Sequence, residues 1–480
     1  MCPVMEQLTK IVSEINGFLW GMYCLIPLLC GVGIYFTLKL DFIQIRRFGL
    51  AVKSTFGGLT LHGERAGKQG MSSFQSLATA IAAQVGTGNL AGAATAIAMG
   101  GPGAIFWMWI AAFFGMATIF AEAVLAQTYK TTDDQGHVTG GPAYYIEQAL
   151  KQRWLGVLFA VVMILTYMVG FNLVASFNIA DSLKAYSFYD PTLTPWIVGI
   201  VLAVVFLVCI SGGGKQIANI TAVLVPVMGV LYLAVTLFVV FTHISLIPAV
   251  FASIFRNAFN FQAIFGGFVG SALMQGIKRG LFSNEAGIGA AACAAGSAGV
   301  SHPAKQGLVQ VLSVFIDTIV VCTATAMLLL CSGVDPTAEA AGMPFVQQAM
   351  AGTLGQFGVI FITVALFLFA FTTLLGNFYY AETGLSYLFN QAPSRTAVYV
   401  QRAIATVVVC LGATMQLTVV WDTADVLMGL MALINVPVIV LLLKPALRCL
   451  DDYIQQKKSG KNPEFKASSI GLKEKVDFWN

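Results

Sequence analysis

Two apolar segments of this sequence contain glycines and polar residues near their centres, where a helix surrounded by lipid gains nothing from them. The first segment has Gly86, Gly88 and Asn89, and the second has glycine-rich stretches at 266–270 and 276–280. A glycine inside a helix costs about 1 kcal/mol relative to alanine. Close packing through small residues is one reason to keep such glycines. Local unwinding of both helices is the interpretation that we favour.

An unwound helix offers backbone groups to ligands of both charges. Free N–H groups at the start of the second half-helix attract an anion, and freed carbonyls attract a cation. A zwitterionic amino acid needs both kinds of group. We therefore expect the amides of 86–89 and the Thr87 hydroxyl to hold a carboxylate. The carbonyls of Ala82 and Val85 are placed to coordinate a small hard cation, which prefers oxygen ligands.

Ionisable residues inside apolar segments are costly, so they are candidates for function. Asp317 lies halfway along one such segment. It can join a structural network, stabilise a cation or bind a proton. Arg279 and Glu285 are close in sequence and could form a gating pair, with a surface charge cluster as the alternative. Glu122, near the end of another apolar segment, fits a gate or an interface better than a ligand site.

The composition indicates how these residues are positioned. Of 480 residues, 58% are hydrophobic and 10% are charged, whereas soluble proteins contain about 25% charged residues. Continuously apolar runs of about 20 residues predict an all-α polytopic membrane protein and exclude a barrel of alternating polarity. The nine cysteines form no Cys-x-x-Cys pair and there are four histidines, so we expect neither a zinc site nor a disulfide framework. No removable signal peptide is evident.

Hydropathy predicts about eleven transmembrane helices. They are expected near 16–38, 73–99, 103–128, 154–180, 195–211, 217–241, 262–292, 306–332, 352–376, 399–416 and 425–444. With the N-terminus outside and the C-terminus in the cytoplasm, only Lys10, Lys184 and Arg256 fall outside, while the other basic residues, Lys278 and Arg279 among them, fall in cytoplasmic segments. This asymmetry favours eleven spans in that orientation, because the positive-inside rule places Lys and Arg on the cytoplasmic side.

The two interrupted helices begin two successive sets of five helices. Five is odd, so the sets insert with opposite orientation, as in transporters built from inverted repeats. The predicted organisation is an extra N-terminal helix and connector at 1–70, a first repeat at 71–245, a second repeat at 246–445 and a basic cytoplasmic tail at 446–480. Corresponding broken helices would build a binding site in mid-membrane.

The sequence resembles the alanine or glycine:cation symporter family, the sodium:alanine symporters, which are similar to the larger amino acid–polyamine–cation superfamily. The motifs that carry the resemblance are Val85-Gly86-Thr87-Gly88-Asn89-Leu90-Ala91-Gly92, Gly100-Gly101-Pro102-Gly103-Ala104 with Phe106-Trp107-Met108-Trp109, Gly140-Gly141-Pro142-Ala143-Tyr144-Tyr145-Ile146, Arg279-Gly280-Leu281-Phe282-Ser283-Asn284-Glu285-Ala286-Gly287 and Phe315-Ile316-Asp317-Thr318. The resemblance covers nearly the whole chain. It implies the five-plus-five inverted repeat of the LeuT fold, preceded by one extra helix.

The resemblance also implies site residues. Substrate contacts are implied in the two broken helices, at Gln84, Thr87, Gly88, Phe268, Gly270, Met274 and Gly276. A sodium site is implied between the first and eighth core helices, from the carbonyls of Ala82, Val85 and Phe369 and the hydroxyls of Thr372 and Thr373. The paired threonines support this site independently, although back-bonding to the preceding turn is an ordinary role for threonine in membrane helices.

The chain departs from the family at two positions that border the pocket. The third core helix reads Val174-Ala175-Ser176-Phe177 where relatives usually carry a glutamine, and Asn377 stands where a tryptophan is expected. The lost amide and the added phenyl ring alter the pocket and so bear on the choice of substrate.

The predicted function is import of alanine or glycine by sodium symport through alternating access, in the inner membrane of a bacterium. Proton coupling through Asp317 and a preference for glutamine are the alternatives within the same fold. An ion channel would need a polar ring around a shared pore, and an enzyme would need clustered catalytic groups; neither is visible. Sodium is the expected coupling ion, the bilayer and the amino acid are the expected partners, nucleic acid is not, and the oligomeric state is open.

Overall fold

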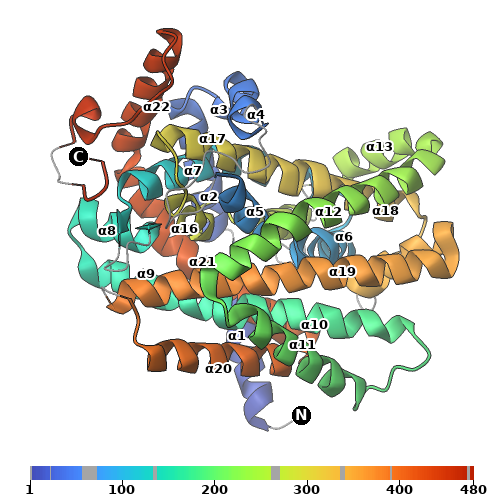
Figure 1. Cartoon of the computed structure of the whole chain (residues 1–480). Helices are drawn as coiled ribbons and strands as arrows, with labels where there is room; N and C mark the ends of the chain where they lie inside the picture. Colours follow the sequence, from blue (N-terminus) through green and yellow to red (C-terminus); the bar gives the residue numbers. More distant parts are fainter. Residues whose placement is uncertain are drawn as a thin grey trace.

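The computed structural model describes residues 3–21, 23–56, 73–132, 138–260, 271–335, 341–389, 392–472 and 476–479. These residues are almost entirely helical (Figure 1). One small hairpin, β1 (Thr131–Thr132) paired antiparallel with β2 (Val138–Thr139), is the sheet in the described part of the chain. The predicted all-α class is therefore confirmed.

Four helices precede the predicted first repeat. They are α1 (Pro3–Leu19), α2 (Leu25–Lys39), α3 (Ile43–Arg46) and α4 (Phe48–Phe56). α1 packs against α21 (Leu417–Leu441), and α2 packs against α7 (Ala104–Thr128). The single span expected at 16–38 is wrong in its start, because the chain turns between α1 and α2, and each of these two helices contacts the bundle separately.

The predicted first repeat contains a broken helix followed by long helices. Its elements are α5 (Ser73–Gln84), the π-helix η1 (Gly88–Gly92), α6 (Ala93–Gly100), α7, α8 (Pro142–Leu150), α9 (Arg153–Ile164), the π-helix η2 (Leu165–Phe171), α10 (Asn172–Ser182), the short 3-10 helix η3 (Leu183–Ala185), α11 (Thr194–Ile210) and α12 (Gly213–Thr242). The chain leaves α5 at Val85 and Gly86 and re-enters a helix at Thr87. The predicted interruption is present at this place.

The predicted second repeat also contains a broken helix. Its elements are the 3-10 helix η4 (Ile244–Leu246), α13 (Ile247–Ala258), α15 (Ala272–Asn284), α16 (Ala290–Gly296), α17 (Pro303–Val314), the π-helix η6 (Phe315–Cys322), α18 (Thr323–Cys331), α19 (Met343–Phe389), α20 (Arg395–Gly412) and α21. The tail adds α22 (Leu443–Lys458) and the 3-10 helix η7 (Ala467–Ile470). The boundaries of the predicted repeats stay predictions.

A further interruption of the helix lies beyond the glycine runs of the predicted second break. α15 continues without interruption through Gly276 and Gly280 and ends at Asn284. The backbone then takes positive φ angles at Glu285 (57°), Gly287 (96°) and Gly289 (94°) before α16 begins. The helix is thus continuous at 276–280, the unwinding predicted at 266–270 falls outside the described residues, and a further interruption, hereafter the second break, is present at Glu285–Gly289.

Gly276 has a packing role that explains why it does not break the helix. A Cβ at this position would collide with the carbonyl oxygen of Ala104 and the side chain of Trp107. α15 thus needs a small residue here to lie closely against α7. The stretch 266–270, including Phe268 and Gly270, lies outside the described residues.

Seven segments of the described chain are long and apolar enough to cross a membrane. They are Ala104–Thr128, Arg153–Ala185, Lys215–Thr242, Pro303–Cys331, Met343–Phe389, Arg395–Gly412 and Leu417–Leu441. Other expected spans correspond to the shorter apolar helices α2 and α11 and to the two broken helices. Since broken helices fail a test for continuous length, the count of eleven stays a prediction.

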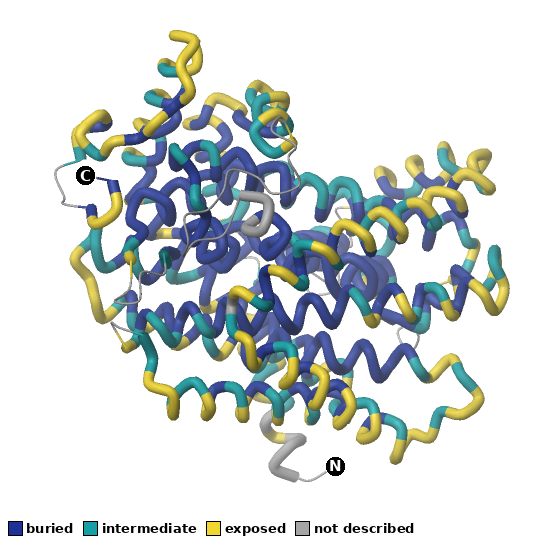
Figure 2. The backbone as a smooth tube through the Cα atoms, viewed as in Figure 1, coloured by how far each residue is buried: buried dark blue, intermediate teal, exposed yellow. Residues whose placement is uncertain are grey.

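Burial is arranged as expected for a membrane bundle. α7, α15 and α17 form a buried centre, and α10 and α12 flank the long helix α19, which crosses the molecule (Figures 1 and 2). α11, α12 and α20 expose large apolar side chains such as Val204, Val208, Val227 and Val407. An exposed apolar belt of this kind is compatible with lipid and not with water.

Candidate substrate and cation site at the two helix breaks

The first break is held against α19 by a glycine. The Gly86 N–H donates to Oδ1 of Asn89 at 2.7 Å, which fixes the turn locally. A Cβ at Gly86 would collide with Oγ1 of Thr373 on α19. Glycine is therefore required at this position, because it lets the unwound backbone approach the α19 side chain.

Three of the five predicted cation ligands lie together at this contact. The Oγ1 atom of Thr373 is 3.3 Å from the carbonyl oxygen of Ala82 and 2.9 Å from that of Phe369. Thr372 also donates to Phe369, at 2.9 Å, but its hydroxyl faces Sδ of Met228 on α12 at 3.8 Å. The group Ala82–Phe369–Thr373 offers only oxygen ligands, which fits sodium.

The fourth and fifth predicted ligands are less directly placed. Val85 is buried in the unwound turn beside Gly86, so its carbonyl belongs to the same break and its role stays a prediction. Thr372 is turned toward α12 rather than toward α5. Both threonines nevertheless donate to the carbonyl oxygen of Phe369 at 2.9 Å, so Thr372 stays a predicted ligand beside Thr373.

The two breaks are joined by a side-chain bond. Nε2 of Gln84, the last residue of α5, donates to the carbonyl oxygen of Asn284 at 2.9 Å. Asn284 is the last residue of α15, and its Oδ1 accepts from the N–H of Ala286 at 3.0 Å. The predicted substrate residue Gln84 thus lies where both interrupted helices meet.

A carboxylate stands at the second break. Oε1 of Glu285 accepts a hydrogen bond from the Tyr167 hydroxyl of η2 at 2.9 Å, and the Tyr167 and Tyr380 rings lie 5.0 Å apart. Four buried polar atoms here have no hydrogen-bond partner among the described residues: Oε1 of Gln84, Nδ2 of Asn284, Oε2 of Glu285 and the Tyr380 hydroxyl. Each buried group left unpaired costs about 1–3 kcal/mol, so their gathering at one place indicates a ligand site.

Asp317 is the second carboxylate near the breaks, and it is fully hydrogen-bonded. Its Oδ1 accepts from Nδ2 of Asn89 at 2.7 Å and from Oγ of Ser283 at 3.1 Å. Its Oδ2 accepts from Ser283 at 2.9 Å and from Thr318 at 2.7 Å. Asp317 therefore ties the first break, α15 and η6 together through neutral donors. The sequence indicated Asp317 as a candidate functional residue but not Asn89 and Ser283 as its hydrogen-bond partners.

Glu122 on α7 is the third buried carboxylate, and it bonds the backbone of the second break. Its Oε2 accepts from the N–H of Gly287 at 3.1 Å, and its Oε1 accepts from Nδ2 of Asn435 on α21. Tyr145 of α8 donates to Oδ1 of Asn435 at 2.5 Å. Glu122 thus contacts the break itself, which is more than the gate or interface role expected from sequence.

Arg279 and Lys278 are buried inside the bundle. Oδ2 of Asp425 on α21 is 2.5 Å from NH2 of Arg279 and 2.7 Å from Nζ of Lys278. The Arg279 guanidinium also lies 4.3 Å from the centre of the Trp421 ring. Both charges are thus paired with one aspartate of α21, and their predicted place on the cytoplasmic side stays a prediction.

The α1 helix adds to this charged group. Nδ2 of Asn16 donates to Asp422 at 2.6 Å, and Nζ of Lys278 donates to Oδ1 of Asn16 at 3.1 Å. Trp20 Nε1 donates to the carbonyl oxygen of Asp425 at 3.1 Å. The pairing of Arg279 with Glu285 as one gate is not formed, since each residue has a different partner.

Aromatic rings separate the charged group from the breaks. The Trp421 and Phe282 ring centres are 4.8 Å apart, those of Phe282 and Phe171 4.6 Å, and those of Phe171 and Tyr167 4.9 Å. A Cβ at Gly88 would lie 3.1 Å from Cδ1 of Phe282. Gly88 therefore lies directly against this aromatic series, and its small size permits the contact.

Not all predicted substrate residues are at the breaks. Thr87 is buried beside Gly88. Met274 lies ten residues before the end of α15, about 15 Å along a helix, and Gly276 faces α7. Met274 and Gly276 thus lie in the first half of α15, away from Glu285–Gly289, and their substrate contacts stay predictions.

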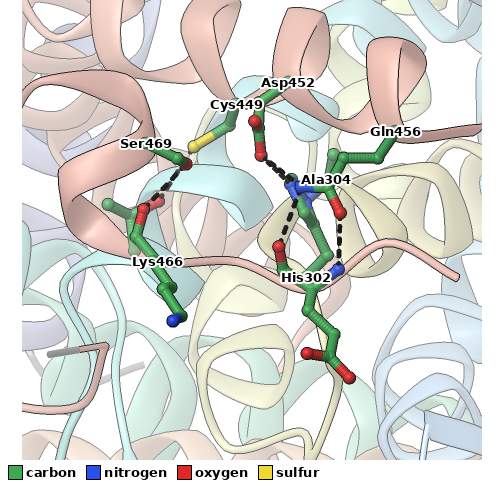
Figure 3. Close-up of polar contacts among 9 residues, drawn as sticks. His302, Ala304, Cys449, Asp452, Gln456, Lys466 and Ser469 are labelled. Atoms are coloured by element: carbon green, nitrogen blue, oxygen red, sulfur yellow. Dashed lines mark hydrogen bonds and ion pairs between the residues drawn. The ribbon is translucent and has the colours of Figure 1, made fainter. Parts of the chain in front are cut away.

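The start of α17, the helix that leads to Asp317, is fixed by the tail (Figure 3). His302 accepts from the N–H of Ala304 through Nδ1 at 3.1 Å, and its Nε2 is 3.0 Å from Oδ2 of Asp452 on α22. Burial lowers the pKa of His302, and the nearby Asp452 only partly opposes this. The neutral ring, with its proton on Nε2, satisfies both contacts.

The last residues of the chain cover the end of α7. Nζ of Lys130 donates to Oε1 of Gln127 at 2.9 Å and lies 3.9 Å from the centre of the Phe478 ring. Nε1 of Trp479 donates to the carbonyl oxygen of Gln127 at 2.7 Å. Burial lowers the pKa of Lys130 to about 7.

The comparisons with known proteins agree with this arrangement. A model of the sodium:alanine symporter family matches residues 5–467. The chain belongs to the sodium:alanine symporter family. It is 41% identical to the probable sodium/glutamine symporter GlnT of Bacillus subtilis, over 99% of this chain and 97% of that protein. It is 41% identical to the sodium/alanine symporter AgcS of Methanococcus maripaludis, over 89% of this chain and 93% of that protein.

Solved structures share the fold. MhsT in complex with L-phenylalanine matches with a TM-score of 0.55 at 12% identity, over 84% of this chain and 92% of that one. A manganese transporter of Eremococcus coleocola matches with a TM-score of 0.51 at 16% identity, over 85% and 82%. The LeuT-like fold implied by the sequence is thereby confirmed, and the protein is a multi-pass membrane transporter and not an enzyme.

Proposed function

We propose that this member of the family imports alanine or glycine together with sodium, by alternating access, across a bacterial plasma membrane. The observation that carries sodium coupling is the group of oxygens from Ala82, Phe369 and Thr373. A cation bound there would link α5 to α19, so its arrival would alter the contact between the two predicted repeats. The N-terminus lies outside and the C-terminus in the cytoplasm in this proposal.

The test is uptake of labelled alanine into liposomes that contain the purified protein. We expect an inward sodium gradient to drive uptake. Thr373→Val removes the hydroxyl that contacts Ala82, and we expect it to raise the sodium concentration for half-maximal uptake about tenfold, as for one lost ligand. Thr383→Val on the same helix is the matched control, since the Thr383 hydroxyl donates to the carbonyl oxygen of Tyr379 and not to that of Phe369. Equal sodium activation curves for the two variants would contradict the sodium site.

Two further arms address the alternatives. Relatives named for glutamine and for alanine are equally similar to this chain, so unlabelled glutamine, glycine and alanine are compared as competitors. Acceleration of labelled uptake by unlabelled substrate inside the liposomes is expected for alternating access. A channel would show no such acceleration, because its binding site does not have to reorient across the membrane in each transport cycle.

A further inference from the structure

We propose that Glu285 supplies the negative charge that binds the ammonium group of the transported amino acid, at the break between α15 and α16. Tyr380 and Gln84 complete the acceptors for its three N–H bonds. This inference rests on the proposed function and names a residue that determines the substrate class of that site.

The backbone at Glu285 indicates that its side chain is needed. Glu285 has φ 57°, a left-handed conformation that costs a residue with a Cβ about 1–2 kcal/mol. Gly287 and Gly289 adopt positive φ in the same turn without that cost. A glycine at 285 would suit the turn better, so the carboxylate is retained against the local backbone preference. Such outliers point to function when the surrounding structure holds them.

The hydrogen bonds of Glu285 are incomplete. It is fully buried, and its Oε1 accepts from Tyr167 while its Oε2 has no partner among the described residues. Asp317 and Glu122 have donors on both oxygens. Within the described chain no ion pair with Lys or Arg is found for Glu285. A buried anion without a counter-charge is costly, and a bound ammonium removes that cost.

Neighbouring acceptors match the geometry of an ammonium group, which has three donors. The Tyr380 ring lies 5.0 Å from the ring of Tyr167, whose hydroxyl bonds Glu285, and the buried Tyr380 hydroxyl has no hydrogen-bond partner among the described residues. Gln84 is tied to Asn284, the residue before Glu285, and its Oε1 is unpaired in the described structure. The three oxygens come from α5, α19 and the second break, so one ammonium would join both broken helices.

The experiment measures binding to the purified full-length protein by calorimetry, in sodium, with alanine, glycine and glutamine as probes. Propionate is the comparison ligand, because it keeps the carboxylate and the methyl group of alanine but lacks the ammonium. Wild type is expected to prefer alanine to propionate by at least about tenfold, the effect of one charge-assisted hydrogen bond. We expect Glu285→Gln to lose most of this preference, and Glu285→Asp to keep part of it.

Two controls distinguish loss of the ammonium contact from a general loss of protein structure. Glu147→Gln makes the same change on α8 outside the site, where Glu147 contacts Arg153 and Tyr387, and should bind all ligands as wild type does. Sodium alone should raise the thermal stability of Glu285→Gln as much as that of wild type, since the Thr373 group is unchanged. Loss of this rise would mark Glu285→Gln as misfolded. The alanine-to-propionate ratio of Glu285→Asp would then serve as the test.

The outcomes distinguish the two proposals. An unchanged preference for alanine over propionate in Glu285→Gln would overturn the role of Glu285. A second result would also overturn it: Glu285→Gln binds alanine like wild type, and wild-type binding becomes stronger at lower pH. The Glu285 carboxyl would then bind a proton and not the ammonium group of the substrate. If wild type binds all three amino acids through Glu285 but no sodium gradient drives uptake, the proposed symport fails while this inference stands.

Discussion

The charged residues on and beside α15 have two different kinds of partner. In its middle, Lys278 and Arg279 share one carboxylate oxygen of Asp425, so each positive charge has a fixed negative partner. At its end, Asp317 and Glu285 are bonded to neutral hydroxyls and amides. Opposite charges fixed on two helices hold those helices together. Carboxylates with only neutral donors have no fixed counter-charge, so a mobile cation can pair with them.

The α1 helix strengthens the paired region and does not reach the breaks. Asn16 connects Lys278 and Asp422, and Trp20 bonds the Asp425 backbone. The aromatic rings of Trp421 and Phe282 then lie between this group and the site. The comparison indicates that the first part of α15 closes the bundle, whereas its last turn and the break that follows bind ligands.

The largest effect is expected from breaking the paired region. Asp425→Asn leaves Lys278 and Arg279 buried side by side without a counter-charge, which should lower stability by about 3–5 kcal/mol. Thermal unfolding of the purified protein measures this loss. Asp422→Asn is the control, because Asp422 is only partly buried and bonds Asn16. Similar unfolding midpoints for the two variants would show that the charge pairing is not what stabilises this region.

A smaller effect is expected at Asp317, whose partners are neutral hydrogen-bond donors. Asp317→Asn keeps the shape but turns an N–H₂ group toward the donors of Asn89, Ser283 or Thr318, so stability should fall by about 1–2 kcal/mol. Sodium-driven alanine uptake should persist at a reduced rate, with no uptake under a proton gradient alone in either protein. Proton-driven uptake in wild type that disappears in Asp317→Asn would instead make Asp317 the coupling site.

The smallest effect concerns the start of α17, away from both regions. Because burial lowers the pKa of His302 in the folded protein, the unfolded chain binds its proton more readily. The contribution of His302 to stability is therefore complete above about pH 6.5, the pKa of an unperturbed histidine, and is lost as the pH falls through the folded value. Loss of this N-cap should cost about 1 kcal/mol.

The measurement is unfolding of wild type and His302→Asn between pH 7 and pH 5. Asparagine can cap the helix but does not titrate in this range. We expect a shallower pH dependence in the variant. Parallel curves for the two proteins would assign the pH dependence to other groups.

Sequence patterns located part of the site well. The glycines around Gly86 predicted the first break, because a run of glycines inside an apolar helix has few other uses, and Thr373 was found as a hydroxyl in an apolar run. The interruption at Glu285–Gly289 was not predicted, since a glutamate, Glu285, occupies its first left-handed position, while Gly276 serves close packing against α7. Glycine content alone cannot separate packing from unwinding.

The sequence by itself determined the class of this protein and the elements of its first break. Apolar runs and the conformational freedom of glycine are local properties that each segment carries with it. The tertiary structure decided which charges meet: Arg279 bonds Asp425 rather than Glu285, and Asn89 bonds Asp317 across 228 residues. Such contacts depend on how the helices pack, because burial forces each charge to find a partner among whatever neighbours the fold brings to it.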